Sequence, residues 1–257
     1  MNLSTQAKIT WCPGCPDFAI LVAFRQTIEM LCSEEKLKIE NIVVGAGIGC
    51  HGKIADYLNM NTFNSLHGRL VPALTGIKIA APHCKVIGFT GDGDSFSEGL
   101  SHLVHGAQKN TDITLFLHNN QTFALTVGQA TGTSPKGFKG GSTPFGSVDE
   151  PFVPLSLVLA AGATFVARTY ALDIEGTKKI MKAAIEHKGF AFVEIIQPCI
   201  TFFDTREHFK DLVYWIAENE YDTTNFDAAT LFLGKENGKV PLGIFYNVIK
   251  ETFEEKI

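Results

Sequence analysis

The sequence lacks the features that mark several large classes of protein. It has no excess of basic residues, because 22 Lys and Arg stand against 27 Asp and Glu and give a net charge of −5. Nucleic-acid binding favours a strongly basic surface. The first ten residues, MNLSTQAKIT, are polar and do not resemble a secretory signal. The apolar stretch 154–167 is shorter than the roughly 20 residues that cross a bilayer. We therefore expect a cytoplasmic protein that binds neither nucleic acid nor a membrane.

The chain contains six cysteines, at positions 12, 15, 32, 50, 84 and 199. In a cytoplasmic protein, cysteines serve more often as metal ligands or buried thiols than in disulfides. The 257 residues are 45% hydrophobic and 19% charged, which is typical of a globular protein with a well-buried core. We find no internal repeat and no linker that clearly divides the chain.

Strand-like segments alternate with helix-like segments along the chain. The predicted strands are rich in Ile, Val and Phe and lie within residues 41–50, 85–94, 112–120 and 190–198. The predicted helices lie within residues 16–37, 69–82, 97–110, 154–163 and 177–188. This alternation predicts an α/β fold, in which a parallel sheet carries helices on both faces.

Polar and glycine-rich sequences follow the predicted strands. GIGC follows the first strand, GDGD the second, NN the third and PC the fourth. Ligands of parallel sheets bind at the carboxyl ends of the strands, so we expect these four loops to meet at one edge. Residues 131–151, rich in Gly, Ser, Thr, Pro and Lys, predict a mobile loop or lid. We place one domain at 1–205 and an extension at 206–257 that packs on this domain or on a partner.

The GDGD loop has the residues that a diphosphate and a metal ion require. Gly91 and Gly93 allow the backbone to turn tightly and to approach a ligand closely. Asp92 offers a carboxylate, and Asn120, 28 residues later, offers an amide oxygen. A helix is expected to begin just after the loop, where free N–H groups could bind phosphate. Such oxygen ligands favour Mg²⁺ or Ca²⁺.

The combination of GDGD with NN at the end of the next strand resembles the thiamine diphosphate motif. In proteins with this motif, the Asp, the second Asn and a backbone carbonyl two residues later hold Mg²⁺. The resemblance therefore implies that Asp92, Asn120 and Thr122 are the magnesium ligands of this chain.

A more specific resemblance covers residues 11 to about 205. The segments WCPGCPDF, GIGCHGK, LHGR, GDGD, HNNQTFALTVGQAT and IIQPC follow the order found in beta subunits of 2-oxoacid:ferredoxin oxidoreductases. The family fold is the diphosphate-binding half of a thiamine diphosphate site, and its beta subunit also carries one [4Fe-4S] cluster. The cluster ligands that this resemblance implies are Cys12, Cys15, Cys50 and Cys199.

The same resemblance implies which residues contact the cofactor. The residues expected to line the cofactor are Ile48, Gly49, Cys50, His51, His67, Gly91, Gly93, Asp94, Ala124 and Leu125. Of these, Gly93 and Asp94 are expected beside the diphosphate, and Ala124 and Leu125 near the thiazolium.

The cysteines by themselves leave alternatives open. A redox disulfide at Cys12 and Cys15 is disfavoured, because only eleven residues precede Cys12 and leave little room for the first strand of such a fold. Structural zinc bound by these residues with Cys50 and Cys199 fits the spacing as well as a cluster does. Only the thiamine motif favours the cluster. The alternative functions are a non-oxidative thiamine diphosphate-dependent decarboxylase or lyase, and a zinc-stabilised, non-catalytic assembly subunit.

Membership of the family would imply oxidative decarboxylation of a 2-oxoacid to an acyl-CoA and CO₂, with electrons passed through the cluster to ferredoxin. The glutamate that activates thiamine diphosphate has no candidate in this chain, and in the family it comes from the alpha subunit. We therefore expect an alpha partner, with gamma or delta subunits as further candidates. The identity of the 2-oxoacid stays open: Leu125 and Val127 suggest an apolar wall, whereas His51 and Lys53 could hold a second carboxylate.

Overall fold

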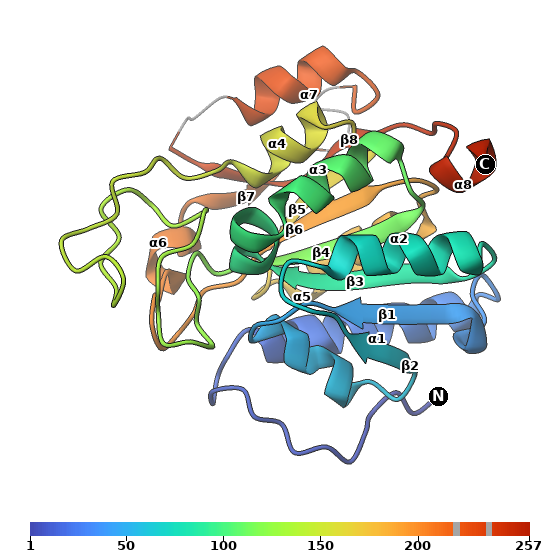
Figure 1. Ribbon diagram of the computed structural model, residues 1–257, viewed down its shortest axis with the longest axis horizontal. Coiled ribbons are helices and arrows are strands. Elements are labelled where there is room, and N and C mark those ends of the chain that lie inside the picture. The colour runs from blue at the N-terminus through green and yellow to red at the C-terminus, as the bar shows by residue number, and fades with distance from the viewer. Residues whose placement is uncertain (218–221, 235–237) are drawn as a thin grey trace.

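The computed structural model describes residues 1–217, 222–234 and 238–257, whose strands form one eight-stranded sheet (Figure 1). The strand order is β2 (Asn61–Asn64), β1 (Ile42–Ala46), β3 (Lys85–Gly91), β4 (Ile113–Asn119), β6 (Ala191–Ile196), β5 (Phe165–Tyr170), β8 (Val240–Asn247) and β7 (Val213–Trp215). All neighbours are parallel except β5 and β8. The first six strands in this order therefore end at one common edge, on the left of Figure 1.

Helices cover both faces of the sheet, as the alternation of segments predicts. On one face α1 (Asp17–Ser33) packs beside α5 (Ile174–Glu186). The other face carries α2 (Leu70–Ala80), α3 (Leu100–Lys109), α4 (Pro154–Ala160) and α7 (Phe226–Leu233). Two short helices, α6 (Arg206–Lys210) and α8 (Phe253–Lys256), follow β6 and β8. The predicted α/β class with a helix-covered, mainly parallel sheet is confirmed.

The central strands are buried on both faces, which explains their nearly continuous apolar sequences. Beneath them, the Phe24 ring of α1 meets the rings of Phe89 and Phe116, with centroids 4.9 and 6.3 Å apart. Full burial of such a ring contributes about 1.5–3 kcal/mol. Pro16 precedes the first turn of this helix, where a proline costs no hydrogen bond. The CPGC segment is thereby held at the start of a firmly packed helix.

Four strands of the sheet escaped the sequence prediction, namely β2, β5, β7 and β8. Residues 165–170 form β5, which follows α4 after a turn of only four residues, 161–164. Residues 240–247 form β8, which pairs with β5 in antiparallel fashion through Phe165 and Asn247. The C-terminal extension thus adds two strands to the same sheet, while the division at residue 205 stays a prediction. Within the described residues, no helix has the length and apolar character needed to cross a membrane.

A buried histidine joins the extension to the body of the sheet. His187, directly after α5, contacts the hydroxyl of Thr164 at 2.9 Å and the side-chain oxygen of Asn247 at 3.1 Å. Its backbone carbonyl accepts a hydrogen bond from the Lys85 ammonium at 3.0 Å. Burial lowers the pKa of His187 from 6.5 to about 4. The imidazole is therefore neutral in the folded protein near pH 7.

This shift predicts acid sensitivity of folding. Between about pH 6.5 and 4 the unfolded chain binds a proton at His187 that the folded chain does not, so stability falls as the pH falls. From near pH 7 to near pH 5 the loss from this group should be about 2 kcal/mol. Urea unfolding at both pH values should show that His187→Gln loses less stability over this interval than the parent. Equal losses in both proteins would contradict the prediction.

Candidate functional site

Loops at the carboxyl ends of β1, β3 and β4 enclose a cavity of about 220 Å³. It is lined by Ile48, Gly49, Cys50, His51, His67, Asp92, Gly93, Asp94, Asn120, Thr122, Phe123, Ala124, Leu125 and Thr126. All the residues expected at the cofactor except Gly91 belong to this lining, as do the three expected magnesium ligands. Gly91 lies just behind it, since a Cβ there would stand 2.6 Å from the His51 ring. The structure therefore brings the expected residues together, while their individual roles stay predictions.

Asp92 presents a buried carboxylate to this cavity. Its Oδ2 accepts hydrogen bonds from the hydroxyls of Thr131 at 2.5 Å and Thr133 at 2.9 Å. Burial raises the pKa of Asp92 to about 6, although these hydroxyl bonds act in the opposite direction. The two threonines lie in the 131–151 segment, which the sequence marks only as a loop. Neither hydroxyl donates to Oδ1, and backbone N–H groups of Asp92 and Asn120 also form hydrogen bonds with the carboxylate.

The oxygen atoms around Asp92 suit a hard divalent cation. Asn120 and Thr122 lie close together, because the Thr122 N–H donates to Asn120 Oδ1 at 3.1 Å. A carboxylate, an amide oxygen and a backbone carbonyl form an all-oxygen donor set of the kind that binds Mg²⁺ or Ca²⁺. The residues present therefore fit a magnesium ion.

Asp94 connects three loops of the site. Its carboxylate accepts hydrogen bonds from the backbone N–H groups of Ile48 at 3.3 Å and Gly68 at 2.8 Å, and from the Thr90 hydroxyl at 2.8 Å. Gly47 has to be a glycine here, because a Cβ would lie 1.9 Å from an Asp94 oxygen. Asp94 thus acts first as a structural anchor that fixes the GIGC loop against the GDGD loop.

His51 lies at the floor of the cavity and is almost completely buried. Its Nε2 has no hydrogen-bond partner among the described residues. Burial lowers the pKa of His51 to about 4, so the ring is neutral near pH 7. Gly49 and Gly91 leave room for this ring, since a Cβ at either would stand 2.6 Å from it. A buried nitrogen without a partner, next to a cavity, is suited to a hydrogen bond with a bound molecule.

The GDGD loop continues into an irregular π-helical turn, Gly93–Glu98, before α3. Such turns are frequent at functional sites. A Cβ at Gly93 would lie 2.1 Å from the Phe123 ring, which lines the cavity. Across the cavity, Val127 has a φ of 77°, which is sterically unfavourable for a β-branched residue. This strained turn sets Ala124 and Leu125 at the cavity wall.

The CPGC turn is tied to the cavity through its neighbours. The Trp11 indole N–H donates to the Cys50 carbonyl at 2.7 Å, and the Cys15 N–H donates to the Cys12 carbonyl at 3.0 Å. The loop after β6 completes the cluster of contacts. Its Thr201 hydroxyl is 3.3 Å from Cys12 Sγ, and its Gln197 amide is 3.7 Å from Cys15 Sγ.

The four predicted cluster cysteines lie in one neighbourhood. Burial, together with the charges of nearby Asp17, Cys199 and Cys12, raises the pKa of Cys50 to about 11, although Lys53 acts in the opposite direction. Burial also raises the pKa of Cys15, with Asp17 and Cys50 among the contributing charges. Positive charge from iron would compensate such crowded thiolates, so the donor chemistry fits an iron–sulfur cluster.

The grouping of side chains in the described residues does not suit a single metal ion held by His, Cys, Asp or Glu. Nowhere in residues 1–217, 222–234 and 238–257 do three or more His, Cys, Asp or Glu side chains form a group that could hold one. The cysteines of a four-iron cluster each bind a different iron, so they stand further apart than the ligands of one ion. This observation counts against a tetrahedral zinc site at these cysteines. Cys84 precedes β3 at the opposite edge of the sheet, as expected for a residue outside the site.

A buried contact between an aspartate and a histidine lies between the cysteines and the cavity. Asp17 Oδ1 is 2.7 Å from His118 Nδ1, and Asp17 Oδ2 is 3.5 Å from Cys15 Sγ. The His118 ring is 6.0 Å from that of His51, and its Nε2 has no partner in the described part of the chain. Neither Asp17 nor His118 was singled out by sequence pattern, because a lone Asp at a helix start and a lone His in a strand carry no spacing signal.

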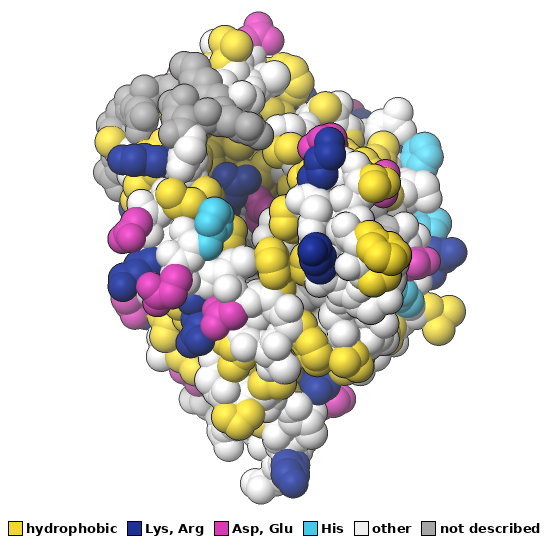
Figure 2. All heavy atoms as spheres, turned by 90° about the vertical axis from the view of Figure 1, so that its left-hand side faces the viewer, with side chains coloured by type: hydrophobic (Ala, Val, Ile, Leu, Met, Phe, Trp, Pro, Cys, Tyr) yellow, Lys and Arg dark blue, Asp and Glu magenta, His cyan; other side chains and the backbone are white. Residues whose placement is uncertain are grey.

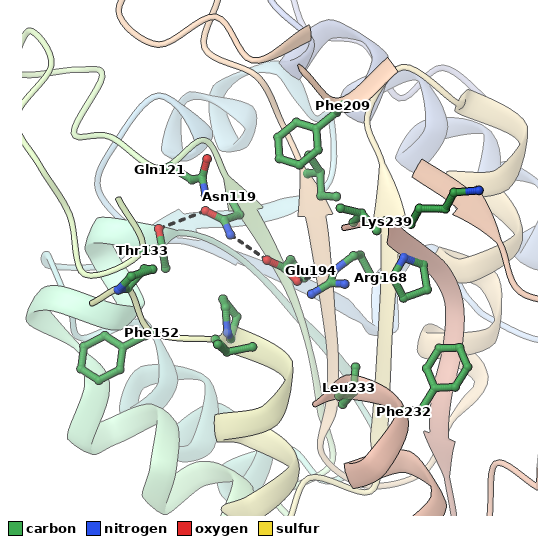
Figure 3. A pocket seen from close by; sticks show the side chains of 16 residues that line it. Asn119, Gln121, Thr133, Phe152, Arg168, Glu194, Phe209, Phe232, Leu233 and Lys239 are labelled. Atoms are coloured by element: carbon green, nitrogen blue, oxygen red, sulfur yellow. Dashed lines mark hydrogen bonds and ion pairs between the residues drawn. The ribbon is translucent and has the colours of Figure 1, made fainter. Parts of the chain in front are cut away.

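Figure 3 shows a second cavity, of about 260 Å³. Its polar wall comes from Asn119, Thr133, Arg168 and Glu194, and apolar residues of the C-terminal extension, including Phe209 and Leu233, close the opposite side. Lys53, a candidate for binding a substrate carboxylate, lines neither cavity and donates to the Thr10 carbonyl at 3.0 Å.

Comparisons with known proteins agree with this geometry. Residues 47–195 match the family model of the C-terminal TPP-binding domain of thiamine pyrophosphate enzymes, and residues 199–257 match the C-terminal part of pyruvate ferredoxin oxidoreductase beta subunits. The chain is 39% identical to subunit beta of 2-oxoacid:ferredoxin oxidoreductase 1 from Aeropyrum pernix, over 98% of this chain and 82% of that protein. It is 35% identical to the 2-oxoglutarate synthase subunit KorB of Archaeoglobus fulgidus, over 96% and 88% of the two chains.

A solved structure is similar over nearly the whole chain. The 2-oxoglutarate:ferredoxin oxidoreductase from Magnetococcus marinus, determined with 2-oxoglutarate, coenzyme A and succinyl-CoA bound, superposes with a TM-score of 0.93 at 32% identity. The match covers 99% of this chain and 86% of that one. The chain, with a thiamine diphosphate-binding domain at its centre, therefore belongs to the family of 2-oxoacid:ferredoxin oxidoreductase beta subunits.

Proposed function

We propose that this beta subunit binds the diphosphate and Mg²⁺ of thiamine diphosphate in the 220 Å³ cavity and carries a [4Fe-4S] cluster beside it. With its partners it would convert a 2-oxoacid and coenzyme A to an acyl-CoA and CO₂ and pass the electrons to ferredoxin. The observation that supports this most is the position of Cys50. It lines the cofactor cavity and also belongs to the group of four cysteines, so the two sites are adjacent.

Different residues of the site would bind the metal ion, the diphosphate and the cluster. Asp92 Oδ1, Asn120 and the Thr122 carbonyl would hold Mg²⁺, and N–H groups of the turn after Gly93 would bind the diphosphate. Bound thiamine diphosphate supplies the electron sink for loss of CO₂. The neutral His51 ring offers its unpartnered Nε2 to the bound cofactor or substrate. Cys12, Cys15, Cys50 and Cys199 would bind the cluster, which accepts electrons singly.

An alpha partner is needed to complete this site. Among the described residues, no glutamate lines the cofactor cavity, so the group that activates the cofactor has to come from another chain. Loops at the same edge expose large apolar side chains: Leu66, Val127, Phe145 and Val148 are each more than half exposed. Figure 2 looks onto this side of the molecule and shows many hydrophobic side chains at its surface. Exposed apolar side chains next to a site are typical of a protein interface.

The family names set aside the two alternative functions, a non-oxidative lyase and a non-catalytic zinc-stabilised subunit. For the substrate we propose a 2-oxoacid whose side chain meets Leu125 and the residues of the partner. The described cavity offers only His51 and His67 as basic groups, so a second carboxylate, as in 2-oxoglutarate, would need a cation from the alpha subunit.

A methyl group at Gly93 should block the cofactor. Gly93→Ala forces the Phe123 ring to move, because the new Cβ would lie 2.1 Å from it, and the ring then enters the cavity. Calorimetric titration should show at least about a tenfold loss of thiamine diphosphate affinity, which is about 1.4 kcal/mol. Gly76→Ala is the matched control, since nothing lies within 4 Å of its Cβ position. Equal affinity in both variants would contradict the proposed cavity.

The isolated chain should be inactive. Given thiamine diphosphate, Mg²⁺, coenzyme A and a 2-oxoacid, it should not reduce methyl viologen, because no glutamate of the described chain reaches the cofactor cavity. Addition of the alpha subunit should restore the reduction. Robust turnover by the isolated chain would show that the activating group is present here.

The cysteine assignment can be tested by metal analysis. In complexes purified without oxygen, Cys199→Ser should lower the iron content by about four atoms per copy of this chain and weaken the visible absorbance that dithionite bleaches. Cys84→Ser, at the opposite edge, should keep the full iron content. Stoichiometric zinc in a colourless parent protein would overturn the cluster.

A further inference from the structure

A chain of buried polar side chains runs from Arg168 through Glu194 and Asn119 to Thr133 (Figure 3) and continues to Asp92. Arg168 Nε donates to Glu194 Oε2 at 2.7 Å, and Asn119 Nδ2 donates to Glu194 Oε1 at 2.6 Å. The Thr133 hydroxyl lies 3.1 Å from Asn119 Oδ1 and 2.9 Å from Asp92 Oδ2. The chain therefore links β5, β6 and β4 to the 131–151 segment and ends on a predicted magnesium ligand.

A contribution to stability alone does not explain why the Arg168–Glu194 ion pair is buried between two strands of the sheet. The two residues face each other in register on neighbouring parallel strands, and their side chains are only 14% and 4% exposed. A buried ion pair costs the hydration of two charges and often stabilises no more than an apolar pair of similar size. A specific role for Glu194 would account for a charge inside a central strand.

Glu194 determines how the Asn119 amide is oriented. An ionised carboxylate only accepts hydrogen bonds, so Asn119 has to turn its NH₂ toward Glu194 and its carbonyl oxygen toward Thr133. The single hydrogen of the Thr133 hydroxyl is then shared between Asn119 Oδ1 and Asp92 Oδ2. Asp92 Oδ2 consequently receives one full hydrogen bond, from Thr131, and one shared bond.

We propose that Glu194 is a positioning residue, which acts through Asn119 and Thr133 to hold the Asp92 carboxylate in the orientation that binds the metal of the cofactor. This proposal rests on the proposed function, in which Asp92 is a magnesium ligand. Residues that orient metal ligands commonly change metal affinity by about 10- to 100-fold when they are replaced.

Glu194→Gln tests the orientation without changing the shape of the side chain. The glutamine carbonyl has to face Arg168 Nε, so its NH₂ meets the NH₂ of Asn119, and that amide flips or loses its bond. A flipped Asn119 donates to Thr133, whose hydrogen then goes entirely to Asp92. A carboxylate with two full hydrogen bonds attracts a cation less strongly.

The measurement is the Mg²⁺ concentration that half-saturates thiamine diphosphate binding by the complex of this chain with its alpha subunit, after removal of metal with a chelator. Glu194→Gln should raise that concentration by about tenfold or more. Thr133→Val should also raise it, for a different reason: Asp92 Oδ2 then keeps only the Thr131 hydroxyl, and the carboxylate is less firmly oriented. Thr133→Ser, which keeps the hydroxyl, should behave like the parent. The control is Glu175→Gln, an exposed glutamate on α5 that pairs with Lys178 and touches neither cavity.

Two further readings separate the possible outcomes. Melting temperatures identify variants that fail to fold. If Glu194→Gln fails to fold, the comparison of Thr133→Val with Thr133→Ser tests the proposal instead. Asp92→Asn reports on the proposed function itself. A strong effect of Asp92→Asn, with parent-like Mg²⁺ dependence in Glu194→Gln and Thr133→Val, would overturn this inference alone. Parent-like behaviour of Asp92→Asn would overturn the magnesium site.

Discussion

Parallel pairing of β1, β3 and β4 is the constraint on which the cofactor site depends. Ala46 pairs with Phe89 and Gly91 pairs with His118, so the three strands end close together at one edge. Their loops then share a small space in which several positions have no room for a side chain. Gly47 against Asp94 is the tightest example, with an added Cβ only 1.9 Å from a carboxylate oxygen. Glycine is needed at these positions because the paired strands bring their loops too close together for a side chain.

Buried carboxylates at this edge differ in how completely they are paired. Asp94 accepts three hydrogen bonds and holds loops together, whereas Asp92 has both hydroxyl donors on one oxygen. Burial without full pairing is costly. The Asp92 oxygen that neither threonine hydroxyl contacts is therefore a place where a cation would stabilise the buried charge. Glu194, in contrast, accepts a hydrogen bond on each of its two oxygens, from Asn119 and from Arg168.

The cysteine group and the cofactor cavity are linked through short contacts. The Trp11 indole fixes the Cys50 loop, and Asp17 connects Cys15 to His118 at the side of the cavity. The proposed cluster would need such a compact arrangement to accept electrons from the proposed cofactor. The packed start of α1, rather than the CPGC sequence itself, places the first two sulfurs there.

The sequence alone placed the helices α1 to α5 and the strands β1, β3, β4 and β6, because apolar periodicity is a local property, and it identified the GDGD, NN and cysteine motifs. It did not reveal β8, whose partner β5 lies about 75 residues away in the chain. Nor did it single out Thr131, Thr133 or Glu194, since isolated threonines and one strand glutamate carry no spacing signal. Tertiary structure decided these positions, because hydrogen bonds between distant segments exist only after the sheet has brought their side chains within about 3 Å.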